Sequence, residues 1–242
     1  MSAVASKPVA GPSSRSRLLR FWGTSVGLKL IMAMTGVLLS GFVLVHMLGN
    51  LQVFQGREAL NAYGELLHKE PAILWTARAV LLGSVGLHIW AYLVLTRKNQ
   101  RARPGAPRRL KHRESTFASR SMRLSGPLVL AFIVYHILHL TTGSAHPDYH
   151  AGQVYENLVG GLRVPSVAII YVLSMALLGL HLWHGVWSMF QTMGADQARY
   201  RSPARRFATA FTVAVVLGFA VVPLAVLAGL VRLPATPAPT TK

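Results

Sequence analysis

Long apolar runs separated by short polar segments dominate this chain. Five such runs lie near residues 27–49, 72–95, 125–142, 166–190 and 207–231. Each is about 18 to 25 residues long, enough to cross a hydrocarbon core of roughly 30 Å at 1.5 Å per residue. A helix of a soluble protein rarely stays apolar on all sides over that length. The pattern predicts an all-α fold, an integral membrane bundle of five transmembrane helices.

The polar segments at either end give the expected boundaries of this bundle. A basic stretch precedes the first run, so we expect a polar N-terminal segment at 1–23 and the transmembrane domain at 24–231. A Pro- and Thr-rich tail is expected at 232–242. The first run is too long for the apolar part of a signal peptide and has no A-x-A cleavage site, which indicates a retained first helix.

The charge of the chain is strongly one-sided. Apolar residues make up 52% and charged residues 13%, yet 25 Lys+Arg stand against 7 Asp+Glu, a net charge of +18. Such an excess is typical of a nucleic-acid-binding protein or of a membrane protein oriented by charge. Counted by segment, 19 basic residues lie in the N-terminal part and in loops 96–124 and 191–206, and 6 lie on the opposite side.

This distribution favours the membrane protein and assigns its orientation. Under the positive-inside rule, the N-terminus is cytoplasmic and the C-terminus lies outside, on the periplasmic side. We therefore predict a multi-pass membrane protein, and the expected location is a bacterial cytoplasmic (inner) membrane. The basic loops need no nucleic acid to explain them, so no nucleic-acid partner is expected.

The absence of cysteine leaves histidine as the main candidate ligand. Without cysteine the chain forms no disulfide, no thiolate zinc site, no iron–sulfur cluster and no covalently attached haem. Ionisable side chains inside a membrane span are costly and usually functional. No Asp or Glu lies in any run, but six histidines do: His46, His88, His136, His139, His181 and His184.

Two motifs that contain these histidines occur twice. Thr35-Gly36 precedes His46 as Ser125-Gly126 precedes His136, with ten residues from each glycine to its histidine. The pattern Gly-Leu-His-X-Trp occupies both 86–90 and 179–183. The chain is therefore interpreted as a weak repeat of a helix pair.

Helix direction then predicts how the histidines pair. The first and third runs travel outward and place His46 and His136 in the outer half of the membrane. The second and fourth runs travel inward and place His88 and His181 roughly 25 Å from their start, near the inner face. Two histidines at one level on different helices suit a cofactor between helices of a bundle.

Haem is the cofactor that best suits two pairs of imidazoles. Zinc prefers three or four ligands, often with a carboxylate or a thiolate among them. Haem iron needs two axial imidazoles, and the apolar porphyrin suits a cleft at lipid depth. Small residues provide either room for the ring or close helix packing: Gly36, Gly41, Gly83, Gly86 and Gly179. We predict two bis-histidine b-type haems.

His139 and His184 leave an alternative open. Each follows a predicted ligand by three residues and so shares its helix face. Either could be the axial ligand with the register moved by one turn, although the repeat favours His136 and His181. His139 and His184 are then expected to support the ligands or to contact the haem propionates.

Several segments, in this order, resemble one family: 36–50, 60–63, 86–90 with Thr96-Arg97, 118–122 and 180–188. It is the family of single-chain, five-helix cytochrome b subunits of succinate dehydrogenase and fumarate reductase, and the likeness extends from about residue 23 to 230. The resemblance implies a distal, outer haem b on His46 and His136 and a proximal, inner haem b on His88 and His181. It also implies two cytoplasmic partners, a flavoprotein with FAD and an iron–sulfur protein.

The same resemblance implies the activity and further sites. Electrons from succinate would pass from the iron–sulfur partner through both haems to a quinone, expected to be menaquinone, with no dicarboxylate chemistry in this chain. Arg120 in the basic loops is a candidate to neutralise a propionate. Polar residues toward the outer side are candidates for the quinone site, or else an ordinary solvated loop: Tyr63, Glu65, His68 and Arg78.

Three alternatives remain from the sequence. Some fumarate reductases of this family carry a glutamate where this chain has Gly179, so its absence favours succinate oxidation over the reverse reaction. A cytochrome b anchor of another quinone-linked dehydrogenase or of a hydrogenase would share the histidines but not the family segments. A transporter would use the histidines to bind protons.

Overall fold

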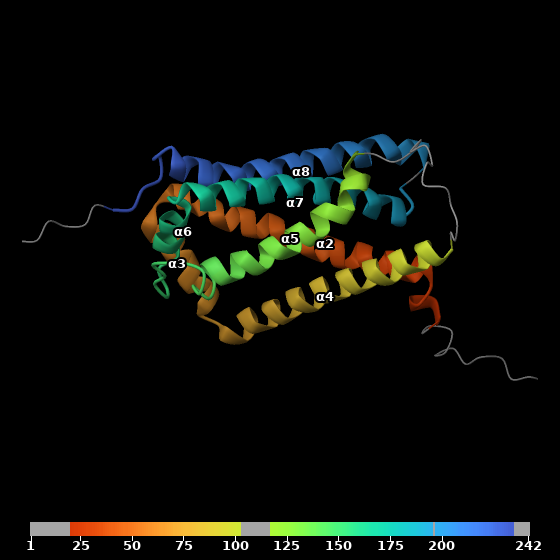
Figure 1. The fold of residues 1–242 in the computed structure, drawn as a ribbon, viewed down its shortest axis with the longest axis horizontal. Coiled ribbons are helices and arrows are strands. Elements are labelled where there is room, and N and C mark those ends of the chain that lie inside the picture. Colours follow the sequence, from red (N-terminus) through yellow and green to blue (C-terminus); the bar gives the residue numbers. More distant parts are fainter. Residues whose placement is uncertain (1–19, 103–116, 196, 235–242) are drawn as a thin grey trace, which may run out of the picture.

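Five long helices form the body of the molecule (Figure 1). The structure is a computed structural model that describes residues 20–102, 117–195 and 197–234. The long helices are α2 (Ser25–Asn50), α4 (Pro71–Arg101), α5 (Phe117–Leu140), α7 (Pro165–Thr192) and α8 (Ala198–Leu227). All five are long and apolar enough to span a membrane, and the described residues contain no strand. The predicted five-span, all-α fold is confirmed.

Local chemistry explains where these helices begin and end. The Thr24 hydroxyl accepts a hydrogen bond from the Gly27 N–H at 3.1 Å and caps α2, while Pro71 and Pro165 occupy the first turns of α4 and α7. Proline suits that position because its missing N–H would have no partner there. The fifth apolar run extends to residue 231, but α8 ends at Leu227, since Gly229 adopts a left-handed φ of 69°.

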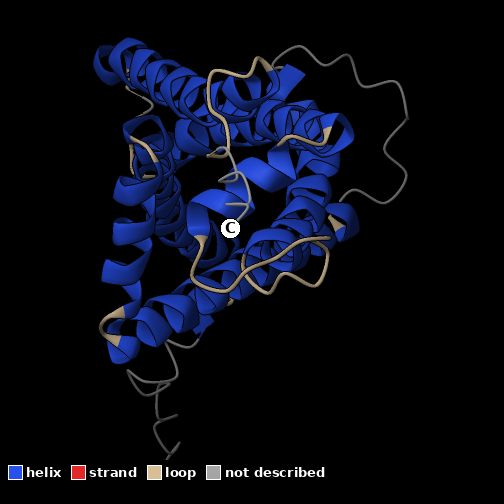
Figure 2. Cartoon of the chain, turned by 90° about the vertical axis from the view of Figure 1, so that its left-hand side faces the viewer, coloured by secondary structure: helices blue, strands red, loops and turns tan. Residues whose placement is uncertain are grey.

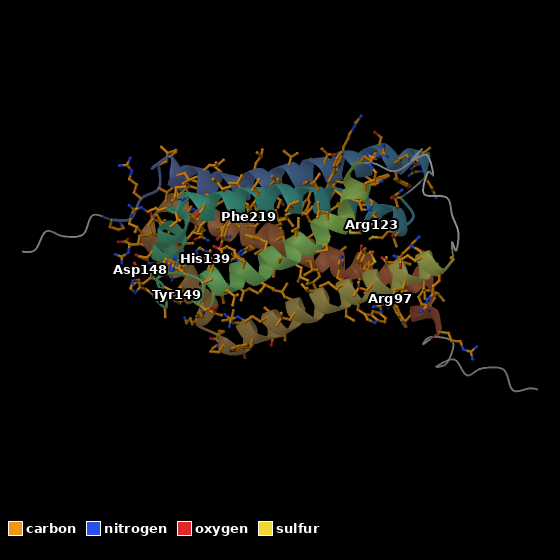
Figure 3. The ribbon with its side chains drawn as sticks, in the orientation of Figure 1. Arg97, Arg123, His139, Asp148, Tyr149 and Phe219 are labelled. Atoms are coloured by element: carbon orange, nitrogen blue, oxygen red, sulfur yellow. The ribbon has the colours of Figure 1, made fainter. Side chains whose placement is uncertain are left out.

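The helices extend beyond their apolar runs mainly at one end. Helix α4 continues to Arg101, α5 begins at Phe117 and α8 begins at Ala198, each within a basic segment. Long basic side chains can keep a helix going there because their charged ends reach the aqueous boundary. Arg97 and Arg123 lie at this end (Figure 3), which we call the basic end. The predicted segment 1–23 and the tail 232–242 lie largely outside the described residues.

The five helices pack as two hairpins and one added helix. Helix α4 packs on α2, and α5 packs on α7, so each predicted helix pair forms a unit. Helix α8 packs on α7 and on α2, and α2 also contacts α7 at the centre of the bundle.

Three short helices cover the opposite end of the bundle, which we call the capped end. They are η1 (Leu51–Gln55), α3 (Arg57–His68) and α6 (Val154–Leu162). Figure 2 looks onto this end. A cluster of buried side chains joins these helices to α7 and α8: Val53, Leu60, Tyr155, Leu158, Val159, Leu162, Tyr171, Val222, Ala225, Val226 and Val231. The hydrophobic pattern did not predict these helices, because they are short and partly polar.

A charged contact holds α3 against α6. Glu156 pairs with Arg57 and accepts a hydrogen bond from the Asn61 side-chain amide at 3.1 Å. The Asn61 carbonyl oxygen accepts the Tyr155 N–H at 2.8 Å. Desolvation by itself raises the pKa of Glu156, but the hydrogen bonds from Asn61 and Arg57 outweigh it and leave that pKa below its usual value. The ionised carboxylate therefore stabilises the capped end.

We expect Glu156→Gln to lower the stability of the capped end at neutral pH by about 1 kcal/mol, since it removes a charge-assisted contact. The folded-state pKa is depressed, so this stabilisation is present above the unfolded-state pKa of about 4.3 and is lost as pH falls through the folded-state value. Thermal unfolding in detergent should separate the two proteins near neutral pH and not in acid. The exposed Glu58→Gln is the matched control, and an equal loss at both pH values would contradict the assignment.

Candidate functional site

The first histidine pair lies between α2 and α5. The ring centroids of His46 and His136 are 5.7 Å apart and the rings are nearly perpendicular, at 80°. Phe42 stacks on the His46 ring at 5.4 Å and 11°, and Phe219 of α8 lies 5.8 Å from it. Phe132 lies 5.8 Å from the His136 ring. Aromatic rings from three helices therefore surround this pair.

The second histidine pair lies between α4 and α7. The ring centroids of His88 and His181 are 6.2 Å apart at an interplanar angle of 54°. The Thr35 hydroxyl of α2 lies 3.0 Å from His88 Nδ1. Among the described residues, His181 Nδ1 is buried without a hydrogen-bond partner. These two pairs are the ones that the sequence positions indicate; their role as ligands stays a prediction.

Each pair joins two helices that are not packing neighbours. The direct neighbours are α2 with α4 and α5 with α7, whereas the paired histidines join α2 to α5 and α4 to α7. Four described helices thus contribute one histidine each, and each pair spans the interface between the two hairpins. A flat group placed between paired imidazoles would not have to separate two closely packed backbones.

The glycines predicted to serve this site have three kinds of surroundings. A Cβ atom at Gly41, Gly83 or Gly86 would meet nothing within 4 Å, so these positions leave space beside the helices. A Cβ at Gly179 would lie 2.8 Å from Val216 Cγ2, which makes Gly179 a close contact between α7 and α8. Gly36 faces His88, with 3.9 Å from such a Cβ to His88 Cε1.

The donor set suits haem better than a bare metal ion. Within the described ranges, no group of three or more His, Cys, Asp or Glu side chains could hold a metal ion. Each pair offers two imidazoles, which is the number that a bis-histidine haem requires. The residues present therefore fit the predicted group.

Tyr171 connects His136 to His139. Its hydroxyl oxygen lies 3.3 Å from His136 Nδ1 and 2.9 Å from His139 Nδ1. The hydroxyl has a single proton, so it can donate to one imidazole while it accepts from the other. If His136 presents Nε2 to a metal, its Nδ1–H donates to Tyr171, and Tyr171 donates to His139.

The His139 side chain packs toward the capped end of the bundle and not toward His46. It is 1% exposed, and its ring stacks on His146 at 4.8 Å and on Tyr135 at 5.4 Å. The Nε2–H of His146 donates to the Asn157 carbonyl at 3.0 Å. Figure 3 shows His139 near the capped end, on the side of Asp148 and Tyr149. Sequence reasoning missed His146 and Asn157, which lie in a polar loop and a short helix without a periodic signal.

The remaining candidates do not all converge. Glu65 and His68 line one surface hollow on α3 together with Ala62, Leu66 and Lys69. Tyr63 packs on Gly49 of α2, where a Cβ would lie 2.8 Å from the tyrosine hydroxyl. Arg78 lies over the Trp75 ring at 4.9 Å.

Two further candidates lie toward the basic end of the bundle. Arg120 is exposed at the basic end of α5, and His184 is half-buried one turn beyond His181. Their predicted contacts with haem propionates stay predictions.

Comparison with known proteins identifies the family. Residues 97–221, just over half of the chain, match the family model described as succinate dehydrogenase/fumarate reductase transmembrane subunit. The chain belongs to this family. No curated protein and no solved structure gives a significant match.

The family assignment settles the class of protein. The chain is a membrane subunit of a succinate dehydrogenase or fumarate reductase. The matched segment contains α5, α7 and most of α8, and with them His136 and His181. His46 and His88 lie before residue 97, so their assignment depends on the internal repeat and on the geometry above.

Two adjacent glycines of α6 provide a test of how His139 is buried. A Cβ at Gly161 would lie 2.6 Å from His139 Cε1 and 3.0 Å from His146 Nε2, whereas a Cβ at Gly160 would meet nothing within 4 Å. We expect Gly161→Ala to destabilise the protein by about 1–3 kcal/mol through overpacking. Gly160→Ala should be neutral or stabilising by up to about 1 kcal/mol. Thermal unfolding measures both, and equal effects would contradict this packing.

Proposed function

We propose that this chain is the cytochrome b subunit of a succinate dehydrogenase (succinate:quinone oxidoreductase). In this proposal it binds two haems b and conducts electrons from an iron–sulfur partner subunit to a quinone. The observation that carries the proposal is the meeting of four histidines from four helices in two pairs, at 5.7 and 6.2 Å. The family assignment supports the enzyme class.

The four histidines hold the haems in this proposal. His46 and His136 take the haem nearer the capped end, and His88 and His181 take the haem nearer the basic end. A bound haem b supplies a one-electron couple at each site. Phe42 and Phe219 pack beside His46, and the Tyr171 hydroxyl fixes the orientation of His136. Gly41, Gly83 and Gly86 leave space for the ring edges.

The basic end faces the cytoplasm in this proposal. The 19 basic residues predicted on that side make it the surface for anionic lipid and for the partners, an iron–sulfur protein and a flavoprotein that carries FAD. The capped end then lies outside. No iron–sulfur cluster can belong to this chain, because it has no cysteine.

The quinone site lies at the capped end in this proposal, and the quinone is menaquinone. Glu65 and His68 share a hollow on α3 and offer a proton donor and acceptor there. Tyr63 lies on the other side of α3, against Gly49, three residues after His46. Arg78 is the least supported of the four, since it stacks on Trp75.

Succinate oxidation is the direction that we propose. No Asp or Glu lies in the apolar spans, and Gly179 packs on Val216, so that position has no room for a carboxylate side chain. A proton route through the membrane that depends on an acidic residue there is therefore not part of this proposal.

Haem content tests the proposal directly. We expect a reduced-minus-oxidised spectrum of the purified protein to show b-type haem at two per chain. His46→Ala, His136→Ala, His88→Ala and His181→Ala should each remove about one haem, because each removes one axial ligand. His150→Ala, on an exposed histidine at the capped end, is the control.

The spectrum of His139→Ala decides between neighbouring ligands. This variant should keep both haems, since His139 packs on His146. Loss of a haem in His139→Ala with retention in His136→Ala would transfer the ligand role to His139. A protein without any haem b signal would refute the proposed function.

The quinone site has its own test in the assembled complex. We expect Glu65→Gln and His68→Ala to lower quinone reduction by tenfold or more, since general acid–base groups contribute roughly 10²- to 10⁴-fold. Haem content should not change. Glu58→Gln on the same helix serves as the control, and unchanged rates in both test variants would make this face of α3 an ordinary solvated surface.

A further inference from the structure

The two hairpins repeat one contact in detail. A Cβ at Gly36 of α2 would lie 3.9 Å from His88 Cε1, and a Cβ at Gly126 of α5 would lie 3.8 Å from His181 Cε1. In each hairpin, the first helix thus presents a glycine to the histidine of the second helix. The residue before each glycine carries a hydroxyl, Thr35 in one hairpin and Ser125 in the other.

In the first hairpin this hydroxyl is in contact with the histidine and favours one tautomer of it. Thr35 Oγ1 lies 2.7 Å from the Ile31 carbonyl, which can only accept, so the hydroxyl proton is directed there. The same oxygen lies 3.0 Å from His88 Nδ1, so with its own proton on the carbonyl it has a lone pair for the Nδ1–H. His88 consequently carries its proton on Nδ1 and has its lone pair on Nε2, the form in which Nε2 can bind iron.

The second hairpin contains the same two groups without the bond. Ser125 is fully buried, and the contact of its hydroxyl is with Met122 Sδ at 4.0 Å. A thioether sulfur is a weak acceptor. His181 Nδ1 is buried and has no hydrogen-bond partner among the described residues. A serine side chain can turn about χ1 more freely than a β-branched threonine, and the position next to Ser125, Gly126, already faces the His181 ring.

We propose that Thr35 and Ser125 are paired positioning residues for the inner haem, and that Ser125 Oγ accepts the Nδ1–H of His181 as Thr35 Oγ1 accepts that of His88. The inference rests on the proposed function, because it concerns how the inner ligands are held. Both hydroxyls lie on α2 and α5, the helices that supply the ligands of the other haem. The helices of one site thereby orient the ligands of the second.

This arrangement has a measurable electronic consequence. A hydrogen bond from Nδ1–H makes the imidazole a stronger electron donor through Nε2 and stabilises ferric iron. Removing the acceptor should therefore raise the midpoint potential of the inner haem and leave that of the outer haem unchanged. We expect the ferric–ferrous equilibrium of one haem to change about three- to tenfold, where tenfold corresponds to about 59 mV for one electron.

The experiment compares side chains of matched size in the purified complex. Thr35→Val and Ser125→Ala remove the hydroxyls, Thr35→Ser retains one, and redox titration with the low-spin ferric EPR signal reports each haem separately. Ser84→Ala is the control, since it removes a buried α4 hydroxyl that bonds the Val80 carbonyl of its own helix. We expect Thr35→Val and Ser125→Ala to shift the same haem, the one that His88→Ala removes. Thr35→Ser and Ser84→Ala should match the wild type.

The outcomes separate this inference from the proposed function. Two haems with wild-type potentials and EPR signals in both Thr35→Val and Ser125→Ala would overturn the positioning role and leave the two-haem proposal standing. A shift in Thr35→Val alone would overturn the assignment of Ser125. A shift of the outer haem would overturn the cross-helix arrangement. A wild-type complex without haem would overturn the proposed function itself.

Discussion

The interaction on which the rest of the structure depends is the meeting of four imidazoles from four helices in two pairs inside the bundle. A polar side chain in hydrocarbon is costly unless it has a partner, so each histidine has to face another helix. The packing within each hairpin does not bring the paired rings together; the interface between hairpins does. The central contact of α2 with α7 and the packing of α8 against both helices hold that interface together.

The two ends of the bundle differ in the side chains that line them. The capped end is closed by a hydrophobic cluster, by the pairing of Glu156 with Arg57, and by the stacked rings of His139 and His146. The basic end has long charged side chains on helices that continue past their apolar runs, with Arg205 over the Trp187 ring at 5.0 Å.

Much of this arrangement could be predicted from sequence because helices are regular. Fixed rise per residue converts the interval from Gly36 to His46 into a depth, and the recurrence of that interval at His136 gives the same depth on another helix. Depth alone does not give rotation about the helix axis, so the sequence could not separate Gly179, a packing contact, from Gly41, which borders open space. Nor could it place His139 against α6, since short amphipathic segments between spans have no periodic signal long enough to recognise.

The family match covers the second half of the chain, and the internal repeat relates that half to the first. The match begins at residue 97 and contains His136 and His181, one member of each pair. In the proposed two-haem arrangement, His136 and His181 each need a second imidazole, and the structure places a histidine of the first hairpin beside each of them. There the repeat places His46 and His88, and the structure brings their rings to 5.7 and 6.2 Å from those of His136 and His181. His46 and His88 are therefore proposed as ligands because their rings lie beside those of His136 and His181.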